Sequence, residues 1–123
     1  MPNFLFLGSL NLMLAVGLGA FGAHGLKAHA NEQQLAWWHT AVNYHMWHAL
    51  GLLSIGLLLL QLPQLTMARH AGWWLQAGVV IFCGSLYAMG LGAPRWFGAI
   101  TPIGGVAMLA GWAMLAWATV KLG

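Results

Sequence analysis

The sequence predicts an all-α fold, a bundle of four transmembrane helices in a polytopic membrane protein. Hydrophobic residues make up 61% of the 123 residues and charged residues only 4%, whereas a soluble domain carries about a quarter of its residues as Asp, Glu, Lys and Arg. Four apolar stretches, at 4–23, 42–62, 71–91 and 102–120, each reach the length of about 20 residues that a helix needs to cross a bilayer. We therefore expect residues 1–123 to form a single transmembrane domain.

The four stretches are predicted to be helices because lipid cannot satisfy backbone hydrogen bonds and a chain this short cannot close a β-barrel. The first stretch also raises the question of a signal peptide, since Ala28-His29-Ala30 resembles a cleavage site. However, no Lys or Arg precedes the stretch, and it is longer than the core of a normal signal peptide. We expect residues 4–23 to remain as the first helix.

The second helix carries start and stop signals. Asn31 and Gln34 have the spacing of a capping box, which predicts a helix start near Glu32, ahead of the membrane proper. Pro63 ends the helix.

The third helix is predicted from the apolar stretch 71–91, and the fourth begins at Thr101-Pro102. A hydroxyl residue before a proline is typical of an N-cap followed by the first helical position. Tryptophans near the helix ends predict two belts at headgroup depth. Trp37, Trp38 and Trp96 would form one belt, and Trp73, Trp74 and Trp117 the other.

Small residues predict where the helices approach one another closely. Burial of apolar area does not drive association in lipid, so tight contacts rest on small side chains. The candidate stripes are Asn11, Ala15, Gly19 and Ala23; Gly84, Ala88 and Gly92; and Gly104, Ala107 and Gly111. Such stripes suit contacts within the bundle, with another membrane-protein subunit or with a second copy of the chain. The expected partners are therefore the lipid bilayer, other membrane-protein subunits or the chain itself.

The few charges exclude a nucleic-acid partner, because Lys27, Arg69, Arg95 and Lys121 are scattered singly and not clustered. They also divide almost evenly between the two membrane faces. We expect both termini to face the cytoplasm, although the count of positive residues on the two sides is close to a tie.

The unusual polar residues are expected to gather at one membrane face. In an up-and-down bundle, the ends of the first and third helices meet the starts of the second and fourth. Helical spacing places Tyr44, His45 and His48 on one face of the second helix. The candidate ligand or cofactor cluster is His24, Tyr44, His45, His48, Ser85, Tyr87 and Arg95.

Three interpretations of the histidines remain open. In the interpretation that we favour, the rings are neutral, join helices by hydrogen bonds and bind no cofactor. In the second, His24, His45 and His48 bind a zinc or copper ion, since imidazole suits either metal. In the third, histidine contacts a haem or a quinone.

The favoured function is a non-enzymatic structural or accessory subunit of a membrane assembly. Glu32 is the only acid and is expected at an exposed helix start. No nucleophile–base pair stands out, so no catalytic residue is predicted. The alternatives are a metal-, haem- or quinone-binding module, and a small oligomeric transporter or channel that needs several copies to enclose a path.

Four segments resemble the bacterial domain-of-unknown-function 423 family, whose eukaryotic relatives are called transmembrane protein 256. They are 19–27 (GAFGAHGLK), 38–50 (WHTAVNYHMWHAL), 82–87 (FCGSLY), and 101–105 (TPIGG) together with Gly111-Trp112. The resemblance implies a small polytopic protein of the bacterial inner membrane, without an established activity or catalytic residues. The family pattern often has Gln at the position of His45, which argues against a dedicated three-histidine metal site.

Overall fold

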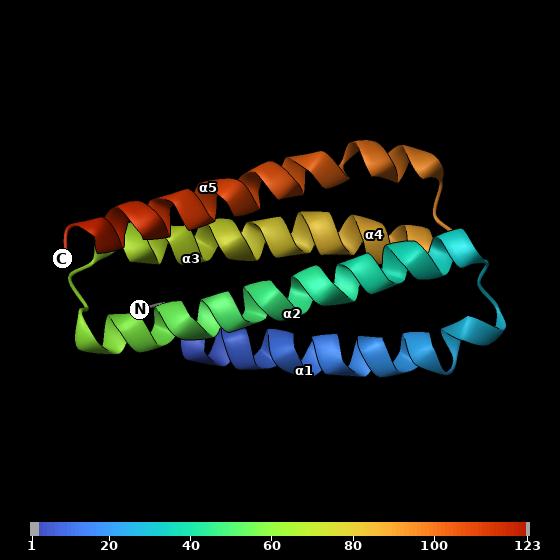
Figure 1. Cartoon of the computed structure of the whole chain (residues 1–123), viewed down its shortest axis with the longest axis horizontal. Helices are drawn as coiled ribbons and strands as arrows, with labels where there is room; N and C mark the ends of the chain where they lie inside the picture. Colours follow the sequence, from blue (N-terminus) through green and yellow to red (C-terminus); the bar gives the residue numbers. More distant parts are fainter. Residues whose placement is uncertain (1–2, 123) are drawn as a thin grey trace.

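Long helices run side by side as a bundle in the computed structural model, which describes residues 3–122 and confirms the all-α fold class (Figure 1). The two ends of the chain lie at the same end of the bundle, next to the connection between the second and third helices (Figure 1). The other two connections lie at the opposite end. We refer to these as the terminal end and the loop end.

The first helix, α1 (Phe4–Ala23), begins with a side-chain cap. The Asn3 side chain accepts a hydrogen bond of 3.0 Å from the Phe6 N–H, which satisfies one of the free N–H groups at the helix start. No residue of α1 is charged, so the helix can lie in lipid along its whole length. A short 3₁₀ turn, η1 (Leu26–Ala28), leads to the next helix.

The second helix, α2 (Glu32–Gln61), has 30 residues and a length of about 45 Å at 1.5 Å per residue. The predicted capping box is present. The Asn31 side chain accepts from the Gln34 N–H at 2.8 Å, and the Gln34 side chain accepts from the Asn31 N–H at 2.9 Å. The predicted helix start near Glu32 is therefore confirmed.

The third helix is continuous but contains a π-helical turn. α3 (Thr66–Gly78) passes into η2 (Val79–Cys83) and then into α4 (Gly84–Gly90). A π turn accommodates an additional residue within a helix, so it sets which side chains of α4 face the bundle.

The predicted stripe on this third helix does not form a packing groove. A methyl group at Gly84 would have no neighbour within 4 Å, so this glycine does not mediate close helix contact. Gly92 lies beyond the helix with a φ of 106°, a left-handed conformation that glycine adopts readily after a helix end.

The last helix, α5 (Thr101–Val120), follows a 3₁₀ helix, η3 (Arg95–Ala99). The predicted cap by Thr101 is wrong, because no side chain caps α5. The preceding turn supplies carbonyl acceptors, such as that of Ile100 for the Ile103 N–H at 3.0 Å, and Pro102 has no N–H to satisfy. The Thr101 hydroxyl bonds to Ser85 instead.

Three helical segments of the described chain are long and apolar enough to cross a membrane: Phe4–Ala28, Thr66–Gly90 and Arg95–Val120. α2 has the length but is not among them, because its first half is polar. Two histidines in that half, His45 and His48, are only 5% exposed. α2 therefore brings these two histidines into the bundle and not into lipid.

Glycines fix the spacing of the helix pairs. α1 packs mainly on α2, while α5 packs mainly on α3 and η2. A methyl group at Gly8 would lie 2.7 Å from the Leu53 backbone nitrogen, and one at Gly104 would overlap the Phe82 backbone nitrogen. The predicted packing groove of Gly104, Ala107 and Gly111 is confirmed, since all three are buried.

One predicted belt residue is part of the core. Trp38 is 2% exposed, and its indole N–H donates to the Leu18 carbonyl at 2.7 Å. Its ring fills the space over Gly22, where a methyl group would lie 2.5 Å from the indole. Trp38 therefore joins α1 to α2 and does not reach the headgroups.

Candidate functional site

The buried polar side chains of the described residues are Asn11, His45, His48 and Ser85. Each of these side chains lies where its helix packs against another helix. In lipid a polar group without a hydrogen-bond partner costs several kcal/mol, because no water is present to take the partner's place. Their partners therefore define the site.

A chain of hydrogen bonds crosses the bundle through His45. The Tyr87 hydroxyl lies 2.9 Å from His45 Nδ1, and His45 Nε2 lies 2.9 Å from Asn11 Oδ1. The Asn11 amide nitrogen donates at 2.8 Å both to Gln76 Oε1 and to the Leu7 carbonyl. The chain thus joins α4, α2, α1 and α3.

The acceptors in this chain fix the state of His45. The two bonds donated by Asn11 Nδ2 set the orientation of its amide, which leaves Oδ1 as an acceptor. His45 Nε2 must then carry a hydrogen, and in the neutral ring Nδ1 accepts from the Tyr87 hydroxyl. A neutral imidazole satisfies every contact.

A second set of bonds joins α2 to α5 through His48. His48 Nδ1 donates to the Tyr44 carbonyl at 2.7 Å, because a carbonyl only accepts. The Trp112 indole N–H donates to His48 Nε2 at 2.9 Å. His48 is therefore also neutral, but it is the opposite tautomer to His45.

Ser85 makes the third polar link between helices. Its hydroxyl lies 2.6 Å from that of Thr101 and also donates to the Phe82 carbonyl at 2.9 Å. This link ties α4 to the start of α5, directly beyond the π turn.

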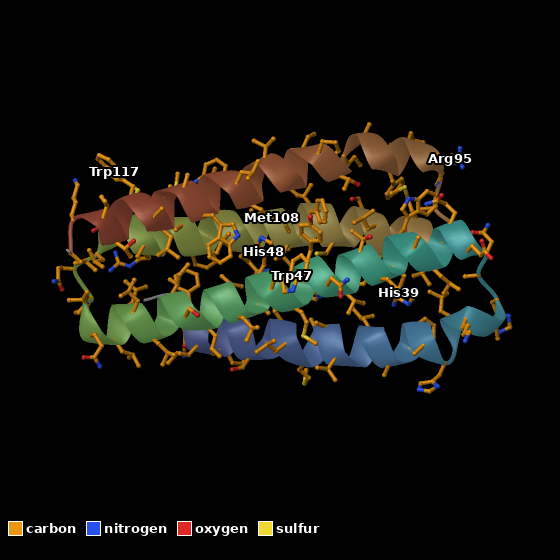
Figure 2. All side chains as sticks on the ribbon, in the orientation of Figure 1. His39, Trp47, His48, Arg95, Met108 and Trp117 are labelled. Carbon is orange, nitrogen blue, oxygen red and sulfur yellow. The ribbon has the colours of Figure 1, made fainter. Side chains whose placement is uncertain are left out.

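The structure brings together Tyr44, His45, His48, Ser85 and Tyr87 in one half of the bundle, but not His24 or Arg95. His24 is the C-cap of α1 and is exposed, and Arg95 is exposed at the loop end, whereas His48 lies near the middle of the bundle (Figure 2).

The predicted metal ligands His24, His45 and His48 do not converge. Gly22 packs on Trp38, so His24 lies level with the first turns of α2. Trp38 precedes His45 by about two helical turns, or roughly 10 Å along the axis. No group of three metal-ligating side chains lies close enough to hold an ion among residues 3–122.

Four side chains of these networks were not in the predicted cluster: Asn11, Gln76, Thr101 and Trp112. Asn11 was assigned only to a stripe of small residues. The signal that could have found Asn11 and Gln76 is an amide in the middle of an apolar run, which needs a partner in lipid.

A groove of about 470 Å³ opens between α2 and α5 beside His48. Aromatic rings form one side of it: Tyr44 is stacked on His48 at 6.0 Å and tilted against Phe82 at 4.7 Å between ring centres. The Tyr44 hydroxyl makes no hydrogen bond within the described part of the chain, unlike that of Tyr87. The remaining walls of the groove are Pro102, Gly105, Val106, Met108, Leu109 and Trp112.

Polar residues also face outward from α2. His39 and Asn43 are exposed, one helical turn apart, and Trp47 follows one turn later at 56% exposure. His39 and Trp47 can be followed along α2 in Figure 2. Gly19 of α1 packs against Val42, which places Asn43 about one helical turn inside the last residue of the uncharged α1. We call His39, Asn43 and Trp47 the outer stripe of α2.

The chain resembles bacterial membrane proteins along its whole length. It is 48% identical over 121 residues to the UPF0382 membrane protein YwdK of Bacillus subtilis, covering 98% of both chains. It is 47% identical over 122 residues to the UPF0382 membrane protein SSP2132 of Staphylococcus saprophyticus, covering 99% of this chain and 100% of that one.

No solved structure matches the chain. Residues 18–105 match the family described as Protein of unknown function (DUF423). This match covers α2, α3 and α4 in full and the glycine-rich start of α5. The chain is a membrane protein and belongs to the DUF423 family.

Proposed function

We propose that the protein is a non-enzymatic accessory subunit of a membrane assembly in the bacterial inner membrane, with α2 as its contact with a neighbouring helix. The observation that supports this proposal is the outer stripe of α2. The Asn43 side chain is exposed beside the last turns of the apolar α1 and makes no hydrogen bond to any described residue. An amide facing lipid is unfavourable, and a second helix that bonds to it relieves the cost.

The buried polar groups also support this proposal, because they serve a structural role. Both ring nitrogens of His45 and of His48 are already bonded to other side chains or to the backbone. A general base or a nucleophile needs an accessible group near a substrate site. These histidines instead hold four helices in place, as a rigid subunit requires.

Site-specific photo-crosslinking tests the proposal. A crosslinking amino acid at Trp47, which is 56% exposed, is expected to give a discrete product with a membrane protein or with a second copy at the native expression level. Replacing Asn43 with Leu in the same chain is expected to weaken that product. A crosslinker at Leu109, which is 71% exposed on α5, is the control. Equal labelling from both positions, or a product that Asn43→Leu leaves unchanged, would overturn the proposal.

A second candidate function rests on the α2–α5 groove, which suits a lipid-soluble ring that carries a carbonyl, such as a quinone. The groove of about 470 Å³ has aromatic walls, and the Tyr44 hydroxyl is a donor without a partner among residues 3–122. A ring could stack beside Tyr44 and accept its hydrogen bond.

Quinone content separates this candidate from the first. The protein is purified gently from its native membrane, and quinone is extracted and measured by ultraviolet absorbance per mole of protein. The candidate function predicts a fixed ratio that falls in Tyr44→Phe and is unchanged in Trp47→Phe. Protein that carries no quinone, or the same amount in both variants, would exclude it.

A further inference from the structure

Arg69 differs from the other charged residues of the described chain, because it is partly buried while Lys27, Glu32, Arg95 and Lys121 are exposed. Its Nη2 group donates to the Pro63 carbonyl at 2.9 Å. Its Nε atom is buried and has no hydrogen-bond partner among residues 3–122. A guanidinium has five N–H donors in a planar fork that suits a phosphate or a carboxylate. Arg69 therefore retains one N–H donor, that of Nε, which does not reach water.

Arg69 borders a pocket of about 330 Å³ between the start of α1 and the end of α2. The pocket has a polar side, made by Arg69 and Asn3. The Asn3 oxygen is bonded to the Phe6 N–H, which leaves the amide nitrogen to donate. The other lining residues are apolar: Phe4, Leu5, Gly56, Leu59 and Leu60. A cationic side beside an apolar groove matches an anion that carries a hydrocarbon chain.

The sequence supplies no acidic side chain to this pocket. Glu32, its only acid, stands at the opposite end of α2 from Leu59 and Leu60, about 40 Å away at 1.5 Å per residue. A partly buried guanidinium whose Nε–H has no partner among residues 3–122 is unfavourable, so an anion bound at this pocket would lower the free energy of this end of the bundle.

The position of the pocket identifies the source of the anion. The pocket lies where α1 begins and where α2 turns into α3 through Pro63, at the terminal end of the bundle. Helix ends of a membrane bundle lie at the depth of lipid headgroups. We propose that Arg69 and Asn3 bind the phosphate of an anionic phospholipid, and that one acyl chain of this lipid lies against Leu59 and Leu60.

Lipid retention measured by native mass spectrometry tests this site. The protein is released from mixed micelles that contain equal amounts of phosphatidylglycerol and phosphatidylcholine. The wild type is expected to retain one phosphatidylglycerol in preference to phosphatidylcholine. Arg69→Gln is expected to lose about tenfold in affinity for phosphatidylglycerol, because a charge-assisted contact to phosphate is removed. Arg95→Gln removes an exposed arginine at the loop end and is expected to bind like the wild type.

A second variant keeps Arg69 and blocks the groove. Leu60 is 64% exposed, so Leu60→Trp can be accommodated and is expected to lower retention of the long-chain lipid while the protein stays folded. Competition with inorganic phosphate distinguishes a lipid from a free anion. Equal retention of the two lipids, equal binding by Arg69→Gln and Arg95→Gln, full binding by Leu60→Trp, or displacement of the lipid by millimolar inorganic phosphate would each overturn the proposal.

Discussion

His45 and His48 are one turn apart on α2 and are held as opposite tautomers. His45 carries its hydrogen on Nε2, because the Asn11 oxygen needs a donor. His48 carries its hydrogen on Nδ1, because the Tyr44 carbonyl needs a donor and Trp112 can only donate. The tautomer of His45 suits its partners on α1 and α4, and the tautomer of His48 suits Trp112 on α5. Two identical residues thereby make two different connections without a buried charge.

The contribution of the Tyr87–His45 hydrogen bond to stability can be measured by substituting Tyr87 and Tyr44 in turn. Tyr87→Phe removes the hydroxyl that donates to His45 Nδ1 and keeps the ring, which packs against Trp38 at 4.8 Å between centroids. We expect the free energy of unfolding to fall by about 1 kcal/mol, the usual size of an interhelical hydrogen bond in a membrane protein. Unfolding by SDS in mixed micelles, followed by circular dichroism, measures the change.

Tyr44→Phe is the matched control, because the Tyr44 hydroxyl has no partner within residues 3–122 while its ring is packed in the same way. Its free energy of unfolding is expected to stay within about 0.5 kcal/mol of the wild type. If the two variants lose the same stability, the Tyr87–His45 bond does not contribute as described.

The composition of the networks shows what a single sequence can predict about a site. Tyr44, His45 and His48 were predicted to share a face of α2; in the structure His45 and His48 are buried, and Tyr44 is half-buried at the α2–α5 groove. Their partners could not be derived, because which residues of α1 and α3 lie level with His45 depends on how the helices slide along one another. That offset is set by glycine contacts such as that of Gly8 with Leu53, and a sequence pattern does not fix it.

At the scale of elements, two glycines on facing helices have opposite roles. Gly104 of α5 lies against the Phe82 backbone, and a methyl group there would overlap it. Gly84 of α4 has nothing within 4 Å of the place where a methyl group would lie. The same substitution should therefore give opposite results at the two positions.

Gly104→Ala is expected to lower the free energy of unfolding by about 1–3 kcal/mol, the usual cost of overpacking, because α5 must move away from η2. Gly84→Ala is expected to leave stability unchanged or raise it by up to about 1 kcal/mol, since alanine is the better helix former. Thermal unfolding in the same detergent compares the two. A stable Gly104→Ala variant would contradict the close contact of α5 with η2.

The π turn η2 gives a further prediction for the third helix. Because a π turn contains one residue more than the α-helix needs, deleting Val80 should convert η2 into an ordinary α turn. Residues on both sides would keep their faces, so Ser85 and Tyr87 would still reach Thr101 and His45. Val80 is 62% exposed, and its loss removes little packing. The variant is expected to fold, with a lower melting temperature.

Deletion of Leu109 is the comparison, because it is 71% exposed but lies in a regular stretch of α5. Removing it rotates every later residue by about 100°, and Gly111 would lose its contact with Leu75. We expect this variant to aggregate during purification, which size-exclusion chromatography would detect. Equal behaviour of the two deletions would mean that η2 does not hold an extra residue.

The start of α2 was more predictable than the interior of the third helix. The capping box at Asn31 is a local signal and was sufficient to locate the start of α2. The π turn, by contrast, has no proline or other break in the sequence VVIFC, so only its packing against α5 and α2 reveals it. Thr101 failed as a predicted cap for a similar reason, since the 3₁₀ helix before it is not visible in the sequence pattern.

At the scale of the whole molecule, the bundle is closed by hydrogen bonds and glycine contacts but stays open between α2 and α5. α5 packs mainly on the third helix, and α2 packs on α1 and on the third helix. α2 and α5 are joined directly through Trp112, which donates a hydrogen bond to His48. Two pockets, of about 390 and 470 Å³, lie along this seam. The low charge content of the sequence predicted the membrane environment. The open seam between α2 and α5 depends on which helices pair, and only the structure shows the pairing.

The distribution of charge over the whole bundle leads to a prediction about orientation. The terminal end carries Arg69 and Lys121, and the loop end carries Lys27 and Arg95. Loops with more positive residues near the helix ends stay on the cytoplasmic side. The two ends of the bundle carry equal numbers of Lys and Arg, so two added lysines should determine the orientation. We expect both termini to face the cytoplasm in the native protein, and the double variant Ala28→Lys/Gln33→Lys to reverse this orientation. Both residues are exposed at the loop end, so the substitutions need not disturb the core.

Reporters fused to the C-terminus measure the orientation: green fluorescent protein is fluorescent on the cytoplasmic side, and alkaline phosphatase is active on the outer side. Gln61→Lys/Gln64→Lys adds the same charge at exposed positions of the terminal end and is expected to keep the native orientation. If both double variants report the same side, the small number of charges does not set how this bundle inserts. Orientation would then have to come from the uneven polarity of the helices themselves, in particular from the polar first half of α2.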